Sequence, residues 1–509
     1  MRDTVEILRA AIAHHQAANH AEAETLYRTV LIADPGHPRA LYLCGLLLLD
    51  TGRPHDAASM LEQAAASRPG HAGSLINLMR ALLADRRPDE ALAAGSSCAL
   101  RSAEVVFLRG TALNALGRPG AAVALLEEAV ALDPANAAAF LNLGNACADL
   151  DRLADAETYC RRAIQLAPGM AEAHASLGFV LTSCGRLDEA IAVCETAIAL
   201  RPDFTQAHWN QAVAALLAGD FELGFQKYEW RKRHDRFRRD FIDLPGPQWD
   251  GSDPAGRTIL IHAEQGLGDT IQFARYLPLI AIRGGYPVLA CEQKLVPFLA
   301  SMTGVAIVPK NAPLPHYDCW LDQMSLPRVF GTRLDSIPSA AGYLRTDPAR
   351  VARWQDALPA GGRVGLAWAG NPAHNNDHRR SLPDGDVAGI LATPGITFVN
   401  LQVGPRAATS PLKDLSSCLS DFAETAALIG AVDLVLTVDT AVAHVAGAIG
   451  KPTWIMLPFA PDWRWLLGRN DTPWYASLRL FRQPTVGDWS AVTAAVVASL
   501  AAWRDARYA

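Results

Sequence analysis

Two different spacings of apolar positions divide this chain of 509 residues into two halves. In the first half, small and apolar residues return in the same order at an interval of about 34 residues, and a proline closes each cycle. The closing prolines are Pro35, Pro69, Pro134, Pro168 and Pro202. Four cycles also carry two alanines and a glycine at fixed distances before the proline, and these glycines are Gly45, Gly110, Gly144 and Gly178. Small residues let two helices cross closely, and proline ends the second helix because it has no N–H to donate.

This period predicts helix–turn–helix units, about six of them from residue 4 to 202, followed by a partly degenerate pair over 205–230. The third unit is irregular, since Met79 takes the glycine position and no proline closes it. Stacked units of this kind form a superhelix with a concave face lined by the first helix of each pair.

From residue 257 onward, apolar runs of strand length alternate with segments of helix length. These runs cover residues 258–262, 287–291, 305–308, 319–321, 363–369, 396–401, 434–438 and 453–457. Strands alternating with helices form parallel sheets with right-handed crossovers. The fold class is therefore α plus α/β. A repeat array over 1–230 and a Pro- and Gly-rich linker over 231–256 precede two Rossmann-like lobes, 257–350 and 360–509.

Polar residues collect directly after several predicted strands. The loops with this character cover residues 262–269, 370–381, 437–444 and 458–465. Ligands of parallel α/β sheets bind at the carboxyl ends of the strands, so these loops predict a cleft between the lobes. The first loop, H-A-E-Q-G-L-G-D, leads into a helix expected over 270–283. Its Asp269 is either a helix cap or a working carboxylate.

Charge, composition and missing motifs argue against several functional classes. A net charge of −6 does not favour nucleic-acid binding. No apolar run approaches the length of about 18 residues that a membrane-spanning helix needs. The nine cysteines show no C-x-x-C spacing, which favours reduced thiols and a cytoplasmic protein. Gly266-x-Gly lacks the third glycine of a dinucleotide fingerprint. We expect no metal and no cofactor.

The repeated frame of the first half is similar to the tetratricopeptide pattern. One position of the first helices carries Asn77, Asn142, Ser176 and Asn210. This row resembles the asparagine ladder of the O-GlcNAc transferase superhelix, whose amides hold a peptide backbone with little regard to its sequence. The alternative is that these residues bond between helices. Leu43 and Leu108 at equivalent positions confine any ladder to part of the array.

The segment from about 257 to 500 resembles a family 9 glycosyltransferase domain of the heptosyltransferase type, which has the GT-B fold. Two motifs carry the resemblance. Gly266-Leu-Gly-Asp269 is similar to the acceptor-side loop of that family, and D-T-A-V-A-H-V-A-G-A-I-G-K-P from Asp439 is similar to its donor-side motif. In GT-B proteins the last helix crosses back to the first lobe, and we expect the same after residue 488.

The resemblance implies a role for each loop. Asp269 is the general base, and Asp439, Thr440 and His444 bind a nucleotide-sugar donor at a helix start. Asp439 and Thr440 otherwise form a plain helix N-cap, and His444 a packed core histidine. Arg379 or Arg380 neutralises the leaving phosphate, and Asn371 and His374 are further cleft candidates. Glu264, a second carboxylate in the first loop, leaves the base assignment open.

These inferences predict an inverting, metal-independent glycosyltransferase that uses a nucleotide-sugar. Its protein acceptor binds the concave face of the repeats. Flagellin is one acceptor that the resemblance to repeat-bearing transferases implies. Two alternatives stay open: a transferase acting on a glycan or lipid acceptor, and a non-enzymatic repeat scaffold with a degenerate transferase domain.

Overall fold

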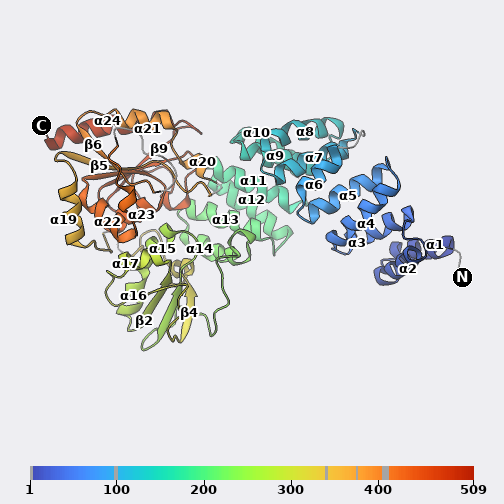
Figure 1. Cartoon of the computed structure of the whole chain (residues 1–509), viewed down its shortest axis with the longest axis horizontal. Coiled ribbons are helices and arrows are strands. Elements are labelled where there is room, and N and C mark those ends of the chain that lie inside the picture. The colour runs from blue at the N-terminus through green and yellow to red at the C-terminus, as the bar shows by residue number, and fades with distance from the viewer. Residues whose placement is uncertain (1–3, 97–100, 339–341, 374–375, 404–411, 509) are drawn as a thin grey trace. The chain divides into compact units, whose positions relative to one another are not determined.

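The chain is described from a computed structural model (Figure 1). The described residues are 4–96, 101–338, 342–373, 376–403 and 412–508. They form two compact units, Met1–Val180 and Leu181–Ala509. The boundary falls inside helix α11 (Ala171–Ser183), so the last repeat helices belong to the same unit as the α/β lobes.

Helices in consecutive packed pairs make up the described part of the first unit. Before α11 they are α1 (Thr4–Gln16), α2 (His20–Ala33), α3 (Pro38–Asp50), α4 (Pro54–Ser67), α5 (Ala72–Ala84), α6 (Pro88–Ser96), α7 (Ala103–Ala115), α8 (Pro119–Leu132), α9 (Ala137–Asp149) and α10 (Leu153–Leu166). The closing prolines lie just beyond the ends of α2, α4, α8 and α10, as the sequence predicts.

Glycine in the first helix of a pair makes room for the side chain that faces it on the second helix. A Cβ on Gly45 would lie 2.6 Å from Leu61, and one on Gly110 would lie 2.7 Å from Leu126. The irregular third unit reverses this arrangement. Met79 fills the first helix, and Gly95 at the facing position of the second helix receives it, since a Cβ on Gly95 would lie 2.6 Å from Met79 Cε. The pair therefore packs closely although the repeat pattern is broken.

The second unit begins with the remaining repeat helices α12 (Leu187–Leu200), α13 (Thr205–Ala218) and α14 (Phe221–Tyr228). Two parallel sheets follow. The first has the order β3-β2-β1-β4 and the second β6-β5-β7-β8-β9. The strands are β1 (Thr258–His262), β2 (Tyr286–Cys291), β3 (Ala306–Pro309), β4 (Cys319–Asp322), β5 (Gly362–Ala367), β6 (Ile396–Asn400), β7 (Leu434–Val438), β8 (Thr453–Leu457) and β9 (Leu478–Arg482). The predicted α plus α/β fold with two sheets is confirmed.

The helices of the lobes cover these sheets. They are α15 (Leu267–Phe273), α16 (Leu277–Ile282), α17 (Val296–Leu299), α18 (Leu326–Val329), α19 (Pro348–Ala357), α20 (Asp377–Arg380), α21 (Asp384–Leu391), α22 (Phe422–Ala431), α23 (Ala441–Ala448) and α24 (Trp489–Tyr508). The helix predicted over 270–283 is two helices joined by a 3-10 turn at Ala274–Tyr276. Pro278, at the start of α16, has no N–H with which to continue the first helix.

Two features of the C-terminal region differ from the prediction. The sequence pattern missed β9, whose five residues lie within an aromatic-rich stretch. The expected crossing of the last helix to the first lobe is wrong, because α24 packs on α21 and β9 of the second sheet. Its buried side chains Trp489, Val492, Val496 and Leu500 form one stripe and join the core of that sheet.

One hydrophobic core joins the last repeat helices to both sheets. Phe221 and Phe225 of α14 meet Trp463 and Trp474, with the Phe221 and Trp474 rings stacked at 5.6 Å. Phe273 of α15 packs edge-on against Trp474 at 5.8 Å. Figure 1 shows α14, α15 and α23 between the two sheets. The aromatic stretch therefore serves packing between the lobes.

The segment predicted as a linker is tied to the first lobe. Arg231 is fully buried in ion pairs. Trp249 is 1% exposed, and its backbone N–H donates to the Trp320 carbonyl at 2.7 Å, so the segment runs beside β4. These contacts hold the last repeat helices and the lobes in one compact unit.

Candidate functional site

Loops from three strand ends meet between the two sheets. Asp269 lies in the first turn of α15 after β1, Asp439 lies in the loop after β7, and Arg464 lies in the 3-10 turn Trp463–Trp465 after β8. Helices α15 and α23 pack directly against each other. At their crossing, a Cβ on Gly268 would lie 2.6 Å from the His444 ring, so only glycine permits this approach. The carboxyl ends of the two central strands therefore face one site.

Arg464 lies at the centre of this site. Its guanidinium donates to the Asp269 carboxylate, to Asp462 at 2.8 Å and to Gln272 at 2.7 Å. The side chain is 7% exposed and lies 4.3 Å from the Trp463 ring centroid. Although burial opposes its charge, the Asp462 and Asp269 carboxylates raise the pKa of Arg464. Arg464 is therefore a fixed cation that links the loops of the two lobes.

Asp269 is both a helix cap and part of this charged cluster. Its Oδ2 accepts from the Gly266 N–H at 2.7 Å, and its Oδ1 accepts from Arg464. Burial raises the pKa of the Asp269 carboxyl, while Arg464 and the Gly266 N–H lower it. Asp462 and Asp240 add to the rise in pKa. The cap that the sequence offered as an alternative is present, and the side chain is still 18% exposed. Its role as a base stays a prediction.

Asp439 and Thr440 stand half-buried at the start of α23. Burial raises the pKa of Asp439 to about 6, and the neighbouring Asp462 adds to the rise while Arg380 opposes it. The Thr440 side chain does not cap the helix, and its hydroxyl lies 3.2 Å from that of Thr437. The N–H groups at the start of α23 therefore lack a side-chain cap from Thr440, which suits them to an anionic ligand.

His444 lies in the contact between the lobes. It is 5% exposed, its Nδ1 lies 2.9 Å from the Tyr475 hydroxyl, and its ring stacks on Trp465. Burial lowers the pKa of His444 well below its ordinary value, and Arg464 and Arg275 lower it further. A neutral imidazole carries no charge to offset phosphate. The packed alternative for His444 therefore fits the geometry better than direct donor contact.

The segment after β5 brings Arg380 of α20 near Asp439. Arg380 is the one whose charge acts on Asp439, and its side chain is 17% exposed. Its Nε lies 3.4 Å from Asp377. Asn371 is exposed, and its side chain accepts from the Ala373 N–H at 3.0 Å in a local turn. His374 lies outside the described residues.

Glu264 forms a buried ion pair with Arg231. Its carboxylate accepts from Arg231 at 2.5 and 3.0 Å and from the Met324 N–H at 3.1 Å, and its side chain has no exposed surface. Burial raises the pKa of Glu264, although Arg231 opposes the rise. This carboxylate has a structural position, and Asp269 is the better placed of the two as a base.

The asparagine side chains of the repeats bond within the array. Asn77 donates to the Tyr42 hydroxyl at 3.1 Å, and Asn142 donates to the Thr111 hydroxyl at 2.8 Å. Asn210, in the second unit, accepts from Gln206 at 2.8 Å. Ser176 is half-buried. The bonds of Asn77 and Asn142 match the interhelix alternative, whereas the bond of Asn210 lies within α13. Peptide binding by these positions stays a prediction.

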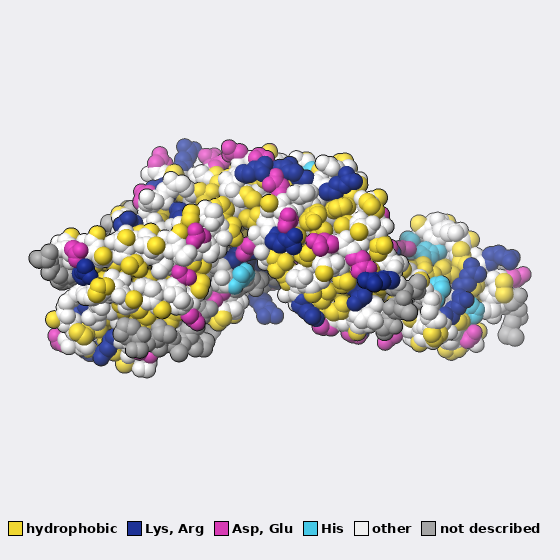
Figure 2. Space-filling model, turned by 90° about the horizontal axis from the view of Figure 1, so that it is seen from above, with side chains coloured by type: hydrophobic (Ala, Val, Ile, Leu, Met, Phe, Trp, Pro, Cys, Tyr) yellow, Lys and Arg dark blue, Asp and Glu magenta, His cyan; other side chains and the backbone are white. Residues whose placement is uncertain are grey.

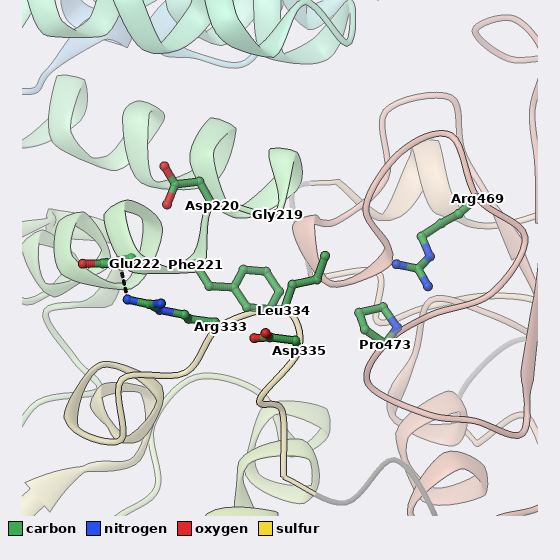
Figure 3. A pocket seen from close by; sticks show the side chains of 9 residues that line it. All are labelled: Gly219, Asp220, Phe221, Glu222, Arg333, Leu334, Asp335, Arg469 and Pro473. Carbon is green, nitrogen blue, oxygen red and sulfur yellow. Dashed lines mark hydrogen bonds and ion pairs between the residues drawn. The ribbon is translucent and has the colours of Figure 1, made fainter.

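A cavity of 670 Å³ is lined by a different set of residues. It lies between the α13–α14 turn, the segment at Arg333 and the loop from Arg469 to Pro473 (Figure 3). An ion pair of 3.2 Å between Arg333 and Glu222 lies along one side. The cavity does not contain any of the predicted site residues.

No group of three or more metal-ligating side chains is present among the described residues, and no described helix is long and apolar enough to cross a membrane. On the face shown in Figure 2, basic and acidic side chains are interspersed.

The repeats match known family profiles. Residues 8–54 and 107–171 match one profile described as "Tetratricopeptide repeat", and residues 48–94 and 149–218 match a second of the same description. The N-terminal half is a tetratricopeptide repeat array. The predicted repeats are thus confirmed.

Similar proteins extend this comparison. Protein FlbA of Caulobacter vibrioides is 27% identical over 527 residues, which cover 96% of this chain and 83% of that protein. The similarity therefore includes the α/β lobes as well as the tetratricopeptide repeats.

Solved structures match over the repeats. One is YrrB, a TPR protein with an unusual peptide-binding site. It is 18% identical with a TM-score of 0.29, over 36% of this chain and 95% of that one. Another is a tetratricopeptide repeat protein from Parabacteroides merdae, 12% identical with a TM-score of 0.40, over 46% of this chain and 93% of that one.

Sequence reasoning missed Arg464 and Asp462 as members of the site. Both lie in a loop that the sequence marks as polar, directly after β8. Tyr228, the last residue of α14, was missed too, and its hydroxyl donates to Gln265 of the loop after β1 at 3.1 Å. For Arg464 and Asp462, the signal available in the sequence was a charged residue on each side of Trp463. No sequence signal marks Tyr228.

Proposed function

We propose that this chain is an inverting glycosyltransferase that moves a sugar from a nucleotide-sugar to a hydroxyl group of a protein acceptor. One observation carries the proposal: Arg464 binds Asp269 at the start of α15, and the charge of Arg464 also acts on Asp439 directly after β7. A site between two parallel α/β lobes, with a carboxylate from each, suits an acceptor on one side and a donor on the other.

In the proposed reaction, Asp269 takes the proton of the acceptor hydroxyl while that oxygen attacks the anomeric carbon. The bond from the anomeric carbon to the phosphate oxygen breaks, and the nucleoside diphosphate leaves with the electron pair. The raised pKa of Asp269 makes it a stronger base than an ordinary carboxylate. The start of α23 and the Arg380 charge favour the diphosphate, with no metal required.

The tetratricopeptide array would supply the acceptor. Repeats of this family form extended surfaces suited to peptides and proteins, and α13 packs directly on the segment that contains Arg464. We take flagellin, the acceptor implied by the sequence resemblance, as the test protein.

A transfer assay with a matched control tests the assignment of the base. Asp269→Asn keeps the side-chain shape and an oxygen for the Gly266 N–H, but it cannot accept the proton. We expect sugar transfer to flagellin to fall at least about 100-fold, within the range for loss of general-base catalysis. Asp421→Asn is the control, because Asp421 also caps a helix and lies near an arginine, yet stands outside the site. Equal activity of the two variants would reject Asp269 as the base.

Donor binding is tested separately by thermal shift. All 12 tryptophans lie at or beyond residue 209, so tryptophan fluorescence reports the unfolding of the second unit alone. A nucleotide at 100 times its Kd stabilises the folded state by about 2.7 kcal/mol. UDP, GDP, ADP, dTDP and CMP are the probes. If none of them raises Tm, the transferase proposal fails.

The capped state of Asp269 favours one rival, a non-enzymatic repeat scaffold. Both carboxylate oxygens already have a partner, as they would in a purely structural cap. The scaffold predicts flagellin binding without nucleotide binding or transfer, so the two assays separate the proposals.

A further inference from the structure

Gln265 has a strained backbone inside the candidate site. Its φ is +64°, in the left-handed region that glycine favours. Of the five non-glycine residues with positive φ among those described, Gln265 and Leu466 lie in the loops around Arg464. A non-glycine residue in this conformation costs about 1–2 kcal/mol. Strain of this kind clusters where a side chain must be held in place for function.

A buried tyrosine of the repeats fixes the direction of the Gln265 amide. The Tyr228 hydroxyl donates to Gln265 Oε1 at 3.1 Å. Tyr228 is 2% exposed, and burial raises the pKa of its phenol to about 12, so the phenol keeps its proton at working pH. Because the oxygen of the amide faces Tyr228, its NH₂ group faces the other way.

That NH₂ group is buried and has no hydrogen-bond partner among the residues that the structure describes. A buried unsatisfied donor costs about 1–3 kcal/mol. The next residue, Gly266, donates its N–H to Asp269, and the charge of Asp269 also acts on the Tyr228 phenol, so Gln265 lies near the candidate base. Strain, a tether and an unpaired donor at one residue indicate that the Gln265 amide has a binding role.

We propose that Gln265 Nε2 donates a hydrogen bond to a backbone carbonyl of an acceptor polypeptide and so positions its hydroxyl at Asp269. This inference rests on the proposed function and specifies which group of the protein acceptor the site binds. A carbonyl oxygen is the acceptor that every peptide offers, whatever its sequence. Tyr228, which orients the amide, belongs to the last repeat helix. Gln265 is therefore suited to bind the substrate that the repeats deliver. Tyr228 is a positioning residue, acting through Gln265.

Two variants test the pair. Gln265→Met keeps the length of the side chain and removes the donor. Its KM for flagellin should rise about tenfold, while the Kd for the nucleotide and the Tm stay near the wild-type values. Tyr228→Phe should raise the same KM by less, because the amide loses only its orientation. The double variant should be no worse than Gln265→Met, since both changes act through one bond.

The control is Tyr27→Phe in the first unit. Tyr27 is fully buried, its hydroxyl lies 3.3 Å from His15, and burial raises the pKa of its phenol to about 12 as well. Removing this hydroxyl should leave the KM unchanged. A change equal to that of Tyr228→Phe would mean that losing any buried tyrosine hydroxyl has this effect, and would overturn the inference.

Flagellin binding, measured directly by calorimetry, separates this inference from the proposed function. Equal flagellin affinity of the wild type and Gln265→Met overturns the inference even if the wild type transfers sugar. If Gln265→Met raises only the KM for a glycan acceptor, Gln265 binds a glycan and not a polypeptide. That result would also overturn the inference. Loss of nucleotide binding and transfer in the wild type instead rejects the proposed function, on which the inference depends.

Discussion

The buried pair of Arg231 and Glu264 offers a sharp test of how the last repeat helices are fixed to the first lobe. Both side chains have no exposed surface, and two hydrogen bonds of 2.5 and 3.0 Å join them. Arg231 also donates to Glu229 and Ser325. Removing one partner of a buried pair leaves an uncompensated charge and costs about 3–5 kcal/mol. We therefore expect Arg231→Met to destabilise the second unit by about that amount.

The expected change in Tm follows from the size of the unit. Unfolding entropy near Tm is about 2 cal/mol/K per residue, or about 0.7 kcal/mol/K for a unit of this length. Arg231→Met should therefore lower Tm by roughly 4–7 °C. Glu264→Gln should cost less, about 2 kcal/mol, because Arg231 keeps its bond of 2.8 Å to Glu229. Thermal unfolding followed by tryptophan fluorescence measures both.

The double variant decides whether the reasoning is right. Arg231→Met with Glu264→Gln buries no charge at either position, so it should be more stable than Arg231→Met alone. The control is Arg333→Met, which breaks the ion pair between Arg333 of the first lobe and Glu222 of α14. The side chains of Arg333 and Glu222 are 69% and 77% exposed. An exposed pair contributes less than about 1 kcal/mol. Additive losses in the double variant, or an equal loss in the control, would refute the argument.

The other predictions concern the site itself. Asp439→Asn should stabilise the unliganded protein at pH 7 by up to about 3 kcal/mol, since folding raises the pKa of this carboxyl from 3.8 to about 6 and so penalises its charge. The gain in Tm should vanish as the pH falls from 6 towards 4, where the wild type is protonated; an unchanged gain at pH 4 would contradict this. Asp240→Asn should move the acidic limb of the profile of kcat/KM against pH to lower pH, because Asp240 helps raise the pKa of Asp269. If this limb does not move, Asp269 is not the group whose titration controls the reaction. Gly268→Ala should destabilise the second unit by about 1–3 kcal/mol, because its Cβ would lie 2.6 Å from His444, and an unchanged Tm would mean that the lobes separate without cost.

Local periodicity was sufficient for most of the architecture. The repeat period places the helices of the first half because each pair packs mainly on its neighbours, and its spacing reflects local helix crossings such as Gly45 on Leu61. Even the irregular unit follows this rule, since Met79 and Gly95 occupy the same two facing positions with their sizes exchanged. Strand-length apolar runs located eight of the nine strands in the described residues for a similar reason, because buried parallel strands are continuously apolar.

Only the tertiary structure decided which charged groups meet. Asp269 and Arg464 are 195 positions apart, and Arg231 reaches Glu264 across 33 positions. No local pattern encodes such pairs, because side-chain ionisation and hydrogen bonding depend on neighbours brought together by packing of whole lobes. The sequence therefore determined which polar loops follow the strands. Packing of α15 on α23 and of α14 on both lobes decided that Glu264 is closed in an ion pair, that His444 is neutral and buried, and that Gln265 is held by the repeats.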